Sequence, residues 1–301
     1  MKFGVNTFNF VSPFRTAADL PLLDRVRGMG FDLIEIAFEA PQTIDVAALA
    51  DHAAGIGLGV LACGVFGPGR NLASADADER RATAEYVRDL IDAAATLAPT
   101  LGSLTPVVGG PIYGAVGKEP APDRDTRQRE RDRAAAELRP LAAYAGERGV
   151  RLALELLNRF ETDLLNVVEQ GLAMVEAVGT PNVGLHLDTF HMHLEERDSA
   201  AAIRRAGERL YHFHACENDR GVPGRGQVRW PEVAAALRDT GYQSAVVIES
   251  FTPEVTSIAR AVCIWRDIAP SQDAIAAEGL AFLRNLLTDT KYEIRDTSEH
   301  S

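Results

Sequence analysis

The sequence contains no uninterrupted apolar run that approaches the roughly 18 to 20 residues needed to cross a membrane. Residues 1–5 enter a strand pattern directly, without the charged-then-apolar layout of a signal peptide. Cysteine is scarce: Cys63, Cys216 and Cys263 are odd in number, widely spaced and form no Cys-x-x-Cys pair. This usage argues against a disulfide framework and is typical of a reducing compartment, so we expect a cytoplasmic protein with no membrane partner.

Positive charge is also in short supply. The chain has 31 Lys and Arg residues against 43 Asp and Glu residues, which gives a formal net charge of -12. A surface with this balance repels a phosphate backbone, so we do not expect nucleic acid as a partner. The 301 residues are 46% hydrophobic, which is enough apolar material for one large core.

Strand-like and helix-like segments alternate along the whole chain. The expected strands cover residues 3–8, 32–37, 59–64, 103–108, 151–156, 183–187, 210–214 and 245–249. The expected helices cover residues 17–29, 46–54, 77–97, 125–148, 167–178, 200–205, 231–239 and 274–287. About eight strand-helix units in a chain of this size predict an α/β fold, a closed (β/α)8 TIM barrel, with an open doubly wound sheet as the alternative. No Gly-x-Gly-x-x-Gly follows the first strand, so the usual dinucleotide fingerprint is missing.

No linker rich in Pro, Gly or Ser divides the chain into two halves. We therefore expect a single barrel domain over residues 1–289. Residues 290–301 are polar and charged, and we expect a disordered C-terminal tail there.

Ligand-type side chains are concentrated in the stretch VGLHLDTFHMH, residues 183–193. Its alternation puts Asp188 on the inward face at the C-terminal end of a strand, with His191 in the loop beyond. Three other expected strands end in an acid or a histidine in the same position: Glu155, His214 and Glu249. Since a barrel has its active site at the C-terminal ends of its strands, and these four strands are consecutive, we expect the four side chains to converge on one mouth.

Three carboxylates crowded into a site of low dielectric repel one another, and a divalent cation removes that repulsion. Oxygen-rich ligation with one imidazole suits Mn2+, Mg2+ or Co2+ better than a structural zinc. We therefore predict a metal site formed by Glu155, Asp188, His214 and Glu249. For any one of these acids the alternative is a helix cap or a surface carboxylate, but four inward ligand-type residues in succession favour the metal site.

Other polar residues flank the expected mouth. Glu161 follows Glu155, and Arg220 follows His214; an arginine and a histidine in a polar mouth suit sugar hydroxyls or an anion. The remaining candidates receive simpler interpretations. His186 and His212 are interpreted as buried side chains one pleat deeper, Cys216 as a buried thiol, and the following as solvated: His52, His193, Glu217, Asp219 and Arg225.

Several runs of the sequence resemble one known family. They are LELLNRFE at 154–161, HLDTFHM at 186–192, HFHACE at 212–217 with Arg220 and PGRG at 223–226, and ESF at 249–251. Together they resemble the ketose 3-epimerases, that is, the D-tagatose, D-allulose (D-psicose) and L-ribulose 3-epimerases of the xylose isomerase-like TIM barrel superfamily. The resemblance extends over nearly the whole chain, from GFDLIE at 30–35 to WR at 265–266.

The resemblance implies a metal-dependent isomerase that inverts C3 of a free ketohexose or ketopentose. The proton would be abstracted and returned through a metal-stabilised enediolate. The implied metal ligands, usually for Mn2+ or Co2+, are Glu155, Asp188, His214 and Glu249. The implied acid/base pair is Glu155 and Glu249, and the implied contacts to the first oxygens of the sugar are Glu161, His191 and Arg220. The resemblance also implies a homodimer or homotetramer.

Asn6 and Phe10 depart from the aromatic pattern that many relatives have after the first strand. The resemblance implies that this region, like the loop at 109–113, shapes the far end of the sugar pocket and the preference among ketoses.

Three other functions fit the same fold. An aldose-ketose isomerase, such as hydroxypyruvate isomerase, would use the same metal and carboxylates but move the proton between C1 and C2. A DNA-repair endonuclease needs a trinuclear zinc site with histidines from early strands, and the only histidine before residue 180 is His52. A non-catalytic sugar-binding barrel would normally have lost at least one of the acids, and none is missing.

Overall fold

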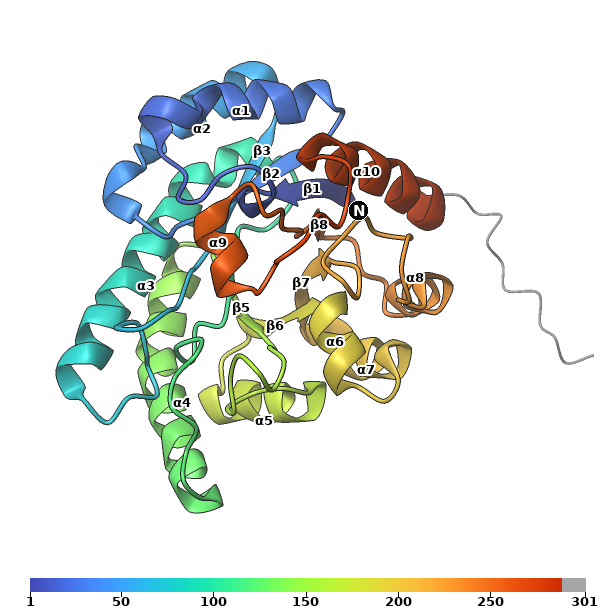
Figure 1. The fold of residues 1–301 in the computed structure, drawn as a ribbon. Helices are drawn as coiled ribbons and strands as arrows, with labels where there is room; N and C mark the ends of the chain where they lie inside the picture. Colours follow the sequence, from blue (N-terminus) through green and yellow to red (C-terminus); the bar gives the residue numbers. More distant parts are fainter. Residues whose placement is uncertain (289–301) are drawn as a thin grey trace, which may run out of the picture.

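The structure, a computed structural model, describes residues 1–288. Its centre is a closed barrel of eight parallel strands, which follow one another around the barrel in sequence order (Figure 1). The strands are β1 (Lys2–Asn6), β2 (Leu33–Ala37), β3 (Gly59–Cys63), β4 (Val107–Gly110), β5 (Arg151–Glu155), β6 (Val183–Asp188), β7 (Leu210–Ala215) and β8 (Ala245–Ile248). The predicted TIM barrel is confirmed and the open sheet is excluded, because β1 pairs with β8.

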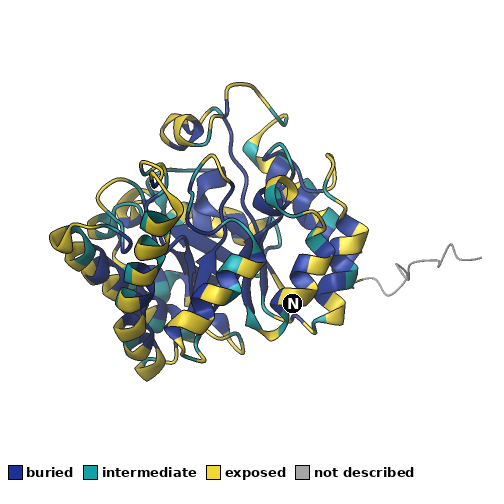
Figure 2. Ribbon diagram, turned by 90° about the horizontal axis from the view of Figure 1, so that it is seen from below, coloured by how far each residue is buried: buried dark blue, intermediate teal, exposed yellow. Residues whose placement is uncertain are grey.

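Helices surround the barrel and cover its outer face (Figure 1). They are α1 (Thr16–Gly28), α2 (Val46–Ile56), α3 (Ala77–Leu97), α4 (Arg124–Glu147), α5 (Val168–Val178), α6 (Thr189–Glu195), α7 (Ser199–Ala206), α8 (Trp230–Asp239), α9 (Thr256–Ala261) and α10 (Gln272–Thr288), with short 3-10 turns η1 (Thr7–Asn9), η2 (Pro41–Thr43), η3 (Ala98–Leu101) and η4 (Gly207–Arg209). The main apolar core lies between strands and helices, where side chains such as Phe31, Leu49 and Val87 are fully buried. Figure 2 shows the buried strands at the centre and the exposed residues on the outward faces of the helices.

Aspartate side chains start many of the helices. The carboxylate accepts a backbone N–H of the first turn, which satisfies a donor that the helix itself leaves unpaired. The helices that begin in this way are α2 at Asp45, α3 at Asp76, α4 at Asp123, α6 at Asp188 and α7 at Asp198. Local sequence therefore sets where these helices begin.

Two segments differ from prediction, one before β4 and one after β6. The strand expected at 103–108 starts only at Val107, because Pro106 has no N–H to donate and pairing with β5 begins at Val107 and Arg151. The segment after β6, expected as a loop, forms α6 because the Asp188 carboxylate accepts the N–H of Phe190 at 2.6 Å.

The barrel interior changes in character along its axis. At the N-terminal end of the strands an apolar cluster fills the interior, with Leu33, Leu61 and Val247 among its members. Further along the strands the interior holds a polar layer, made of Asn6, Glu35, His186, His212 and His214, which are all at most 1% exposed. The strand ends with their carboxylates lie beyond this layer. The packed lower layers leave the C-terminal mouth as the place for a ligand, as in other barrels of this kind.

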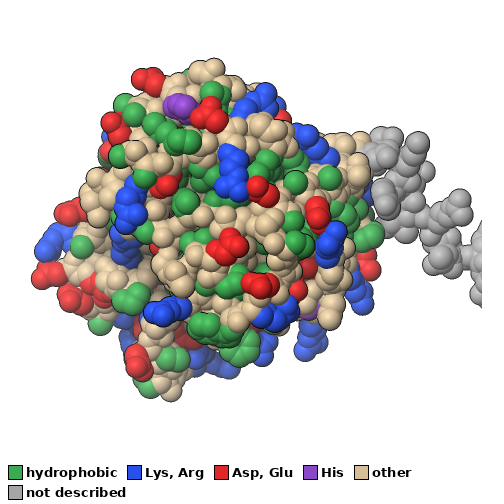
Figure 3. Space-filling view, turned by 45° about the horizontal axis from the view of Figure 1, so that its top comes forward, with side chains coloured by type: hydrophobic (Ala, Val, Ile, Leu, Met, Phe, Trp, Pro, Cys, Tyr) green, Lys and Arg blue, Asp and Glu red, His purple; other side chains and the backbone are tan. Residues whose placement is uncertain are grey.

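The surface carries charges of both signs. On the face seen in Figure 3, Lys and Arg side chains are interspersed with Asp and Glu. Among residues 1–288 no helix is long and apolar enough to cross a membrane. The predicted tail at 290–301 lies outside the described residues, and the domain boundary at residue 289 stays a prediction.

Gly110, at the end of β4, provides a test of the barrel packing. Its φ is +119°, and a Cβ added there would lie 2.5 Å from the carbonyl oxygen of Gly64. Because neither the dihedral angle nor the backbone contact can relax cheaply, we expect Gly110→Ala to lower the free energy of unfolding by about 2 to 4 kcal/mol. The matched control is Gly28→Ala in α1, where a Cβ would meet no atom within 4 Å; it should stabilise by up to about 1 kcal/mol. Equal urea midpoints for the two variants would contradict this packing.

Candidate active site

The four predicted strand-end residues lie together at the C-terminal mouth of the barrel. Glu155 ends β5, Asp188 ends β6, His214 is the penultimate residue of β7, and Glu249 directly follows β8. One side-chain oxygen or nitrogen from each lies within 4.8 Å of the others, and all four side chains are buried. The structure thus brings these residues together, while their role as metal ligands stays a prediction.

Two fully buried atoms of this cluster lack a hydrogen-bond partner within residues 1–288: Asp188 Oδ2 and His214 Nδ1. They are 3.8 Å apart, and His214 Nδ1 is 3.6 Å from Glu249 Oε1. These separations are too long for hydrogen bonds. Two atoms that each lie about 2.2 Å from one cation are separated by roughly 3 to 4.4 Å, so the distances suit a shared ion. The donor set of carboxylates and one imidazole fits a divalent cation.

The two oxygens of Asp188 have different surroundings. Oδ1 accepts the N–H of Phe190 at the start of α6, and Oδ2 faces His214 and the rest of the cluster. The helix-cap alternative raised by the sequence is therefore correct for one oxygen, and the other oxygen remains available to a cation.

The three carboxylates of the cluster differ in how strongly their surroundings stabilise the ionised form. Burial raises the pKa of Glu155 well above its usual range, and the negative charge of Glu249 raises it further. Burial also raises the pKa of Asp188, to about 7, although the nearby Arg220 lowers it. For Glu249 the effect of burial is outweighed by His214 and Arg220, so its pKa lies below its usual value. Positive charge is therefore most needed beside Glu155 and Asp188.

His191 presents an N–H to the mouth. Its Nδ1 accepts the backbone N–H of Asn158 at 3.0 Å, and burial lowers the pKa of the ring well below its usual value. The imidazole is therefore neutral with its proton on Nε2, which lies 3.9 Å from Glu155 Oε1. His191 was expected in a loop and lies instead in α6, which holds it at the cavity wall.

Arg220 is fixed by two carboxylates and two aromatic rings. Nη1 donates to Glu249 and Nη2 to Glu161, each at 3.2 Å. The guanidinium lies 3.8 Å from the centre of the Phe190 ring and 4.9 Å from that of Phe251, so it has cation-π contacts with both. Its backbone has φ of 65°, a conformation uncommon outside glycine. The loop after β7 thus adopts an unfavourable backbone angle at the residue that reaches the mouth.

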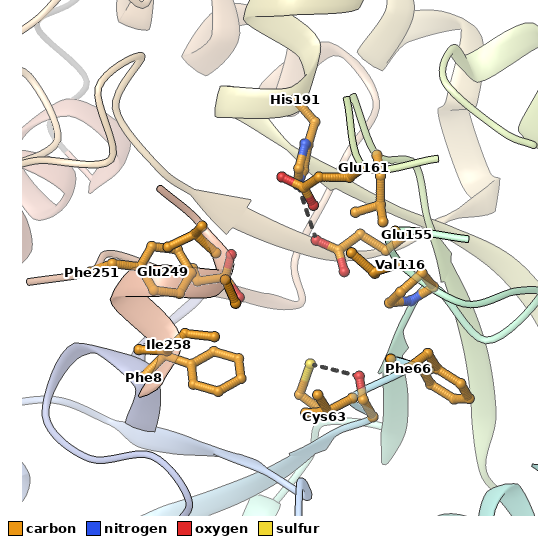
Figure 4. Close-up of a pocket in the computed structure, with 18 of the residues that line it drawn as sticks. Phe8, Cys63, Phe66, Val116, Glu155, Glu161, His191, Glu249, Phe251 and Ile258 are labelled. Atoms are coloured by element: carbon orange, nitrogen blue, oxygen red, sulfur yellow. Dashed lines mark hydrogen bonds and ion pairs between the residues drawn. The ribbon is translucent and has the colours of Figure 1, made fainter. Parts of the chain in front are cut away.

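A cavity of about 330 Å³ opens beside these residues. Figure 4 shows Glu155 and Glu249 on opposite sides of it, with His191 and Glu161 next to Glu155. Val116 lies beside Glu155 and Phe251 beside Glu249 (Figure 4). The wall away from these groups is largely apolar; its side chains include Phe8, Val65, Phe66, Ile258 and Val262. The cavity therefore combines a charged end with an apolar end.

The segment after β1 reaches the cavity, but not through Asn6 or Phe10. Neither residue lines the cavity: Asn6 is buried in the barrel interior, and Phe10 belongs to the main core. Phe8 lines the cavity instead and packs on Phe251 with ring centres 5.8 Å apart. The cause is the 3-10 turn η1, which begins because the Asn6 side chain accepts the N–H of Phe8. The loop at 109–113 contributes Pro111 to the wall of the cavity.

Glu35 was missed by the sequence reasoning. Its Oε2 lies 2.7 Å from His214 Nε2 and accepts the Asn6 amide at 2.7 Å, and its Oε1 lies 2.6 Å from His212 Nε2. Burial acts to raise the pKa of Glu35, but the two histidines outweigh it, so the pKa lies below its usual value. One signal was available: Glu35 is the single charged residue of the strand LIEIA at 33–37, and a charge is rarely fully buried unless paired.

Glu217 was predicted to be solvated, and this is wrong. Its carboxylate is buried and accepts three backbone N–H groups of the loop after β7 and the indole N–H of Trp230. Arg225 and His193 are exposed and Cys216 is buried, as expected. Glu217 therefore organises the loop that carries Arg220.

Comparison with known proteins gives a consistent result. Residues 23–286 match a family described as xylose isomerase-like TIM barrel. The chain is 36% identical to D-psicose 3-epimerase of Enterocloster bolteae over 95% of this chain and 96% of that relative. It is 34% identical to L-ribulose 3-epimerase of Mesorhizobium japonicum over 94% of this chain and 93% of that relative. The chain belongs to the xylose isomerase-like TIM barrel family.

Within this family, the relatives place the chain among the ketose 3-epimerases, which confirms the resemblance seen in the sequence motifs. A solved relative shows the same relationship in three dimensions. D-psicose 3-epimerase from Clostridium cellulolyticum H10, determined with D-tagatose, has a TM-score of 0.86 and 31% identity, with coverage of 95% of this chain and 99% of that chain. The endonuclease alternative gains no support, because His52 lies on α2 and pairs with Asp24.

Glu155 and Glu249 should affect the stability of the metal-free protein in opposite ways. The pKa of Glu155 is raised in the folded protein, so ionisation of Glu155 destabilises the fold as pH rises. The pKa of Glu249 is lowered, so ionisation of Glu249 stabilises the fold, and this stabilisation is lost as pH falls through the pKa of Glu249 in the folded protein. At pH 8 in EDTA we expect Glu155→Gln to raise, and Glu249→Gln to lower, the free energy of unfolding by about 0.5 to 2 kcal/mol each. Urea denaturation measures both, and both differences should shrink in acid. Changes of the same sign would contradict this charge distribution.

Proposed function

We propose that this protein is a metal-dependent ketose 3-epimerase that acts on a free ketohexose or ketopentose. The observation that carries the proposal is the pair of buried carboxylates, Glu155 and Glu249, on opposite sides of one cavity (Figure 4). Asp188 and His214 complete a cluster able to hold a divalent metal. The names of the relatives support the same reaction.

Inversion at C3 needs removal of the proton next to the C2 carbonyl and return of a proton to the opposite face. We assign these steps to Glu155 and Glu249, which would act as base and acid and exchange these roles with the direction of the reaction. A divalent metal held by Glu155, Asp188, His214 and Glu249 would polarise the C2 carbonyl and make the C3 proton more acidic. The position of the two glutamates across the cavity supports a substrate held between them.

Glu161, His191 and Arg220 are our candidates for contacts to the first oxygens of the sugar. His191 offers its Nε2 proton, and Arg220 Nε has no partner within residues 1–288. The Glu161 carboxylate can accept from a hydroxyl. Donors and an acceptor fixed in place would hold C3 between the two glutamates, which reduces the entropic cost of reaching the reactive geometry.

The apolar end of the cavity supports an unphosphorylated substrate. Of the described residues that line the cavity, Arg220 is the only Lys or Arg, and it is already paired with Glu161 and Glu249. A phosphate placed against Phe8, Phe66 and Ile258 would lose its hydration without gaining a cation. We therefore propose that free ketoses are accepted and phosphorylated ketoses are rejected.

Three finer properties are also proposals. Mn2+ is our candidate for the metal, with Co2+ or Mg2+ as substitutes, because the ligands are mainly oxygen. The three unpaired cysteines support a cytoplasmic location.

The side chains of Phe160 and Trp265 are 80% and 71% exposed, and exposed aromatic side chains support a homodimer or homotetramer. Light scattering that gives the mass of a single chain would contradict the oligomer.

An aldose-ketose isomerase is the competing function, because the same metal and carboxylates could move a proton between C1 and C2. The product distinguishes the two. We expect the Mn2+-loaded protein to convert D-fructose to D-psicose, D-tagatose to D-sorbose and L-ribulose to L-xylulose, as measured by chromatography. Aldose products would contradict the epimerase, and no product from any ketose would favour a non-catalytic barrel.

Matched variants and substrates sharpen this experiment. Glu249→Gln should lower kcat by about 10² to 10⁴-fold because it removes one of the two proton-transfer groups. Glu254→Gln, the same substitution at an exposed position five residues later, should leave kcat unchanged. D-Fructose 6-phosphate should be turned over at least about 100-fold less efficiently than D-fructose. Efficient turnover of the phosphate ester would contradict the proposed free substrate.

A further inference from the structure

Glu35 occupies the centre of the polar layer under the mouth. It lies in the middle of β2, 0% exposed, where its inward side chain meets residues from β1 and β7. Oε2 accepts the Asn6 amide and lies 2.7 Å from His214 Nε2. Oε1 lies 2.6 Å from His212 Nε2. Both carboxylate oxygens thus lie beside nitrogen atoms, with hydrogen-bond geometry at Oε2 only.

The contact with Glu35 fixes which nitrogen of His214 can bind a cation. A carboxylate accepts a proton, so His214 keeps its Nε2 proton toward Glu35. The other ring nitrogen, Nδ1, then presents its lone pair to a cation. Nδ1 is the atom that faces Asp188 Oδ2 and Glu249 Oε1 across 3.8 and 3.6 Å, and it has no hydrogen-bond partner within residues 1–288.

We propose that Glu35 is a positioning residue for the metal site: it sets the ring orientation and the tautomer of His214 so that Nδ1 is presented to the ion. The inference rests on the proposed function, because it concerns the same metal. Glu35 would not itself bind the ion or touch the substrate, since it lies on the far side of the His214 ring from Asp188 and Glu249.

Asn6 and His212 explain how Glu35 is itself held. The hydrogen bond from Asn6 to Oε2 and the close contact of Oε1 with His212 restrain the carboxylate beside His214. Gly109 leaves space for this arrangement, because a Cβ there would lie 3.2 Å from both His186 Nδ1 and His212 Cδ2. The polar layer is therefore packed around one carboxylate, as expected of a group that orients a ligand imidazole.

The test measures the Mn2+ dissociation constant of the EDTA-stripped full chain by titration calorimetry. We expect Glu35→Ala to raise it about 10 to 100-fold. Glu35→Gln should raise it less, because the amide oxygen can still accept from Asn6 and His214 while its NH2 group faces His212. The visible absorption of the Co2+-loaded protein should change in Glu35→Ala, because a rotated imidazole alters the ligand field of the ion.

Glu137→Gln is the matched control, since Glu137 is a partly buried glutamate of α4 that pairs with Arg80 of α3 on the outside of the barrel. It should lower stability but leave the Mn2+ dissociation constant within about twofold of wild type and the Co2+ spectrum unchanged. A folded Glu35→Ala with wild-type affinity and spectrum would overturn the inference. If Glu35→Ala does not fold, Glu35→Gln decides: a raised constant supports the inference and an unchanged one overturns it. A wild-type chain that binds neither ion would instead overturn the proposed function itself.

Discussion

The concentration of buried carboxylates at one end of the barrel is the constraint on which the rest of the site depends. Burial raises the pKa of Glu155 and Asp188, so their ionised forms are unfavourable without compensating positive charge. The protein supplies part of this charge itself. Burial acts to lower the pKa of His214, but Glu35 and Glu249 raise it well above its usual value, and Arg220 pairs with Glu249. A divalent cation bound at His214 Nδ1 would replace the proton that this nitrogen carries in the metal-free protein and would complete the balance, and the same charge that stabilises the carboxylates would activate a carbonyl substrate.

The surrounding structure keeps this arrangement in place. Below the mouth, the polar layer around Glu35 orients the imidazole of His214. Beside the mouth, Phe190 and Phe251 both contact the guanidinium of Arg220, and the backbone of Arg220 has an uncommon φ angle. Above it, α9 packs through Ile258 against Phe8 and Phe251 and closes the apolar side of the cavity. Rigid supports of this kind are what precise placement of a reacting carbon requires.

Some of the site could be predicted from the sequence because its residues end apolar strands. Glu155, Asp188 and Glu249 each follow a buried run, and barrel topology then places such ends at one mouth. Glu35 could not be found in this way, because it lies mid-strand and its partners come from strands distant in sequence. The cavity wall at Phe8 depends on the 3-10 turn η1, and the burial of Glu217 depends on a loop conformation; neither leaves a periodic signal.

The position at which solvent deuterium enters the substrate tests the central claim most directly. The Mn2+-loaded protein would be incubated with D-fructose in D2O and followed by proton NMR. If one glutamate removes the C3 proton and the other returns a proton exchanged with solvent, deuterium should appear at C3 of the D-psicose formed. As the reaction reverses, deuterium should also appear at C3 of the remaining D-fructose. Deuterium at C1 with C3 unlabelled would contradict the account, because the carboxylates would then act on the neighbouring carbon.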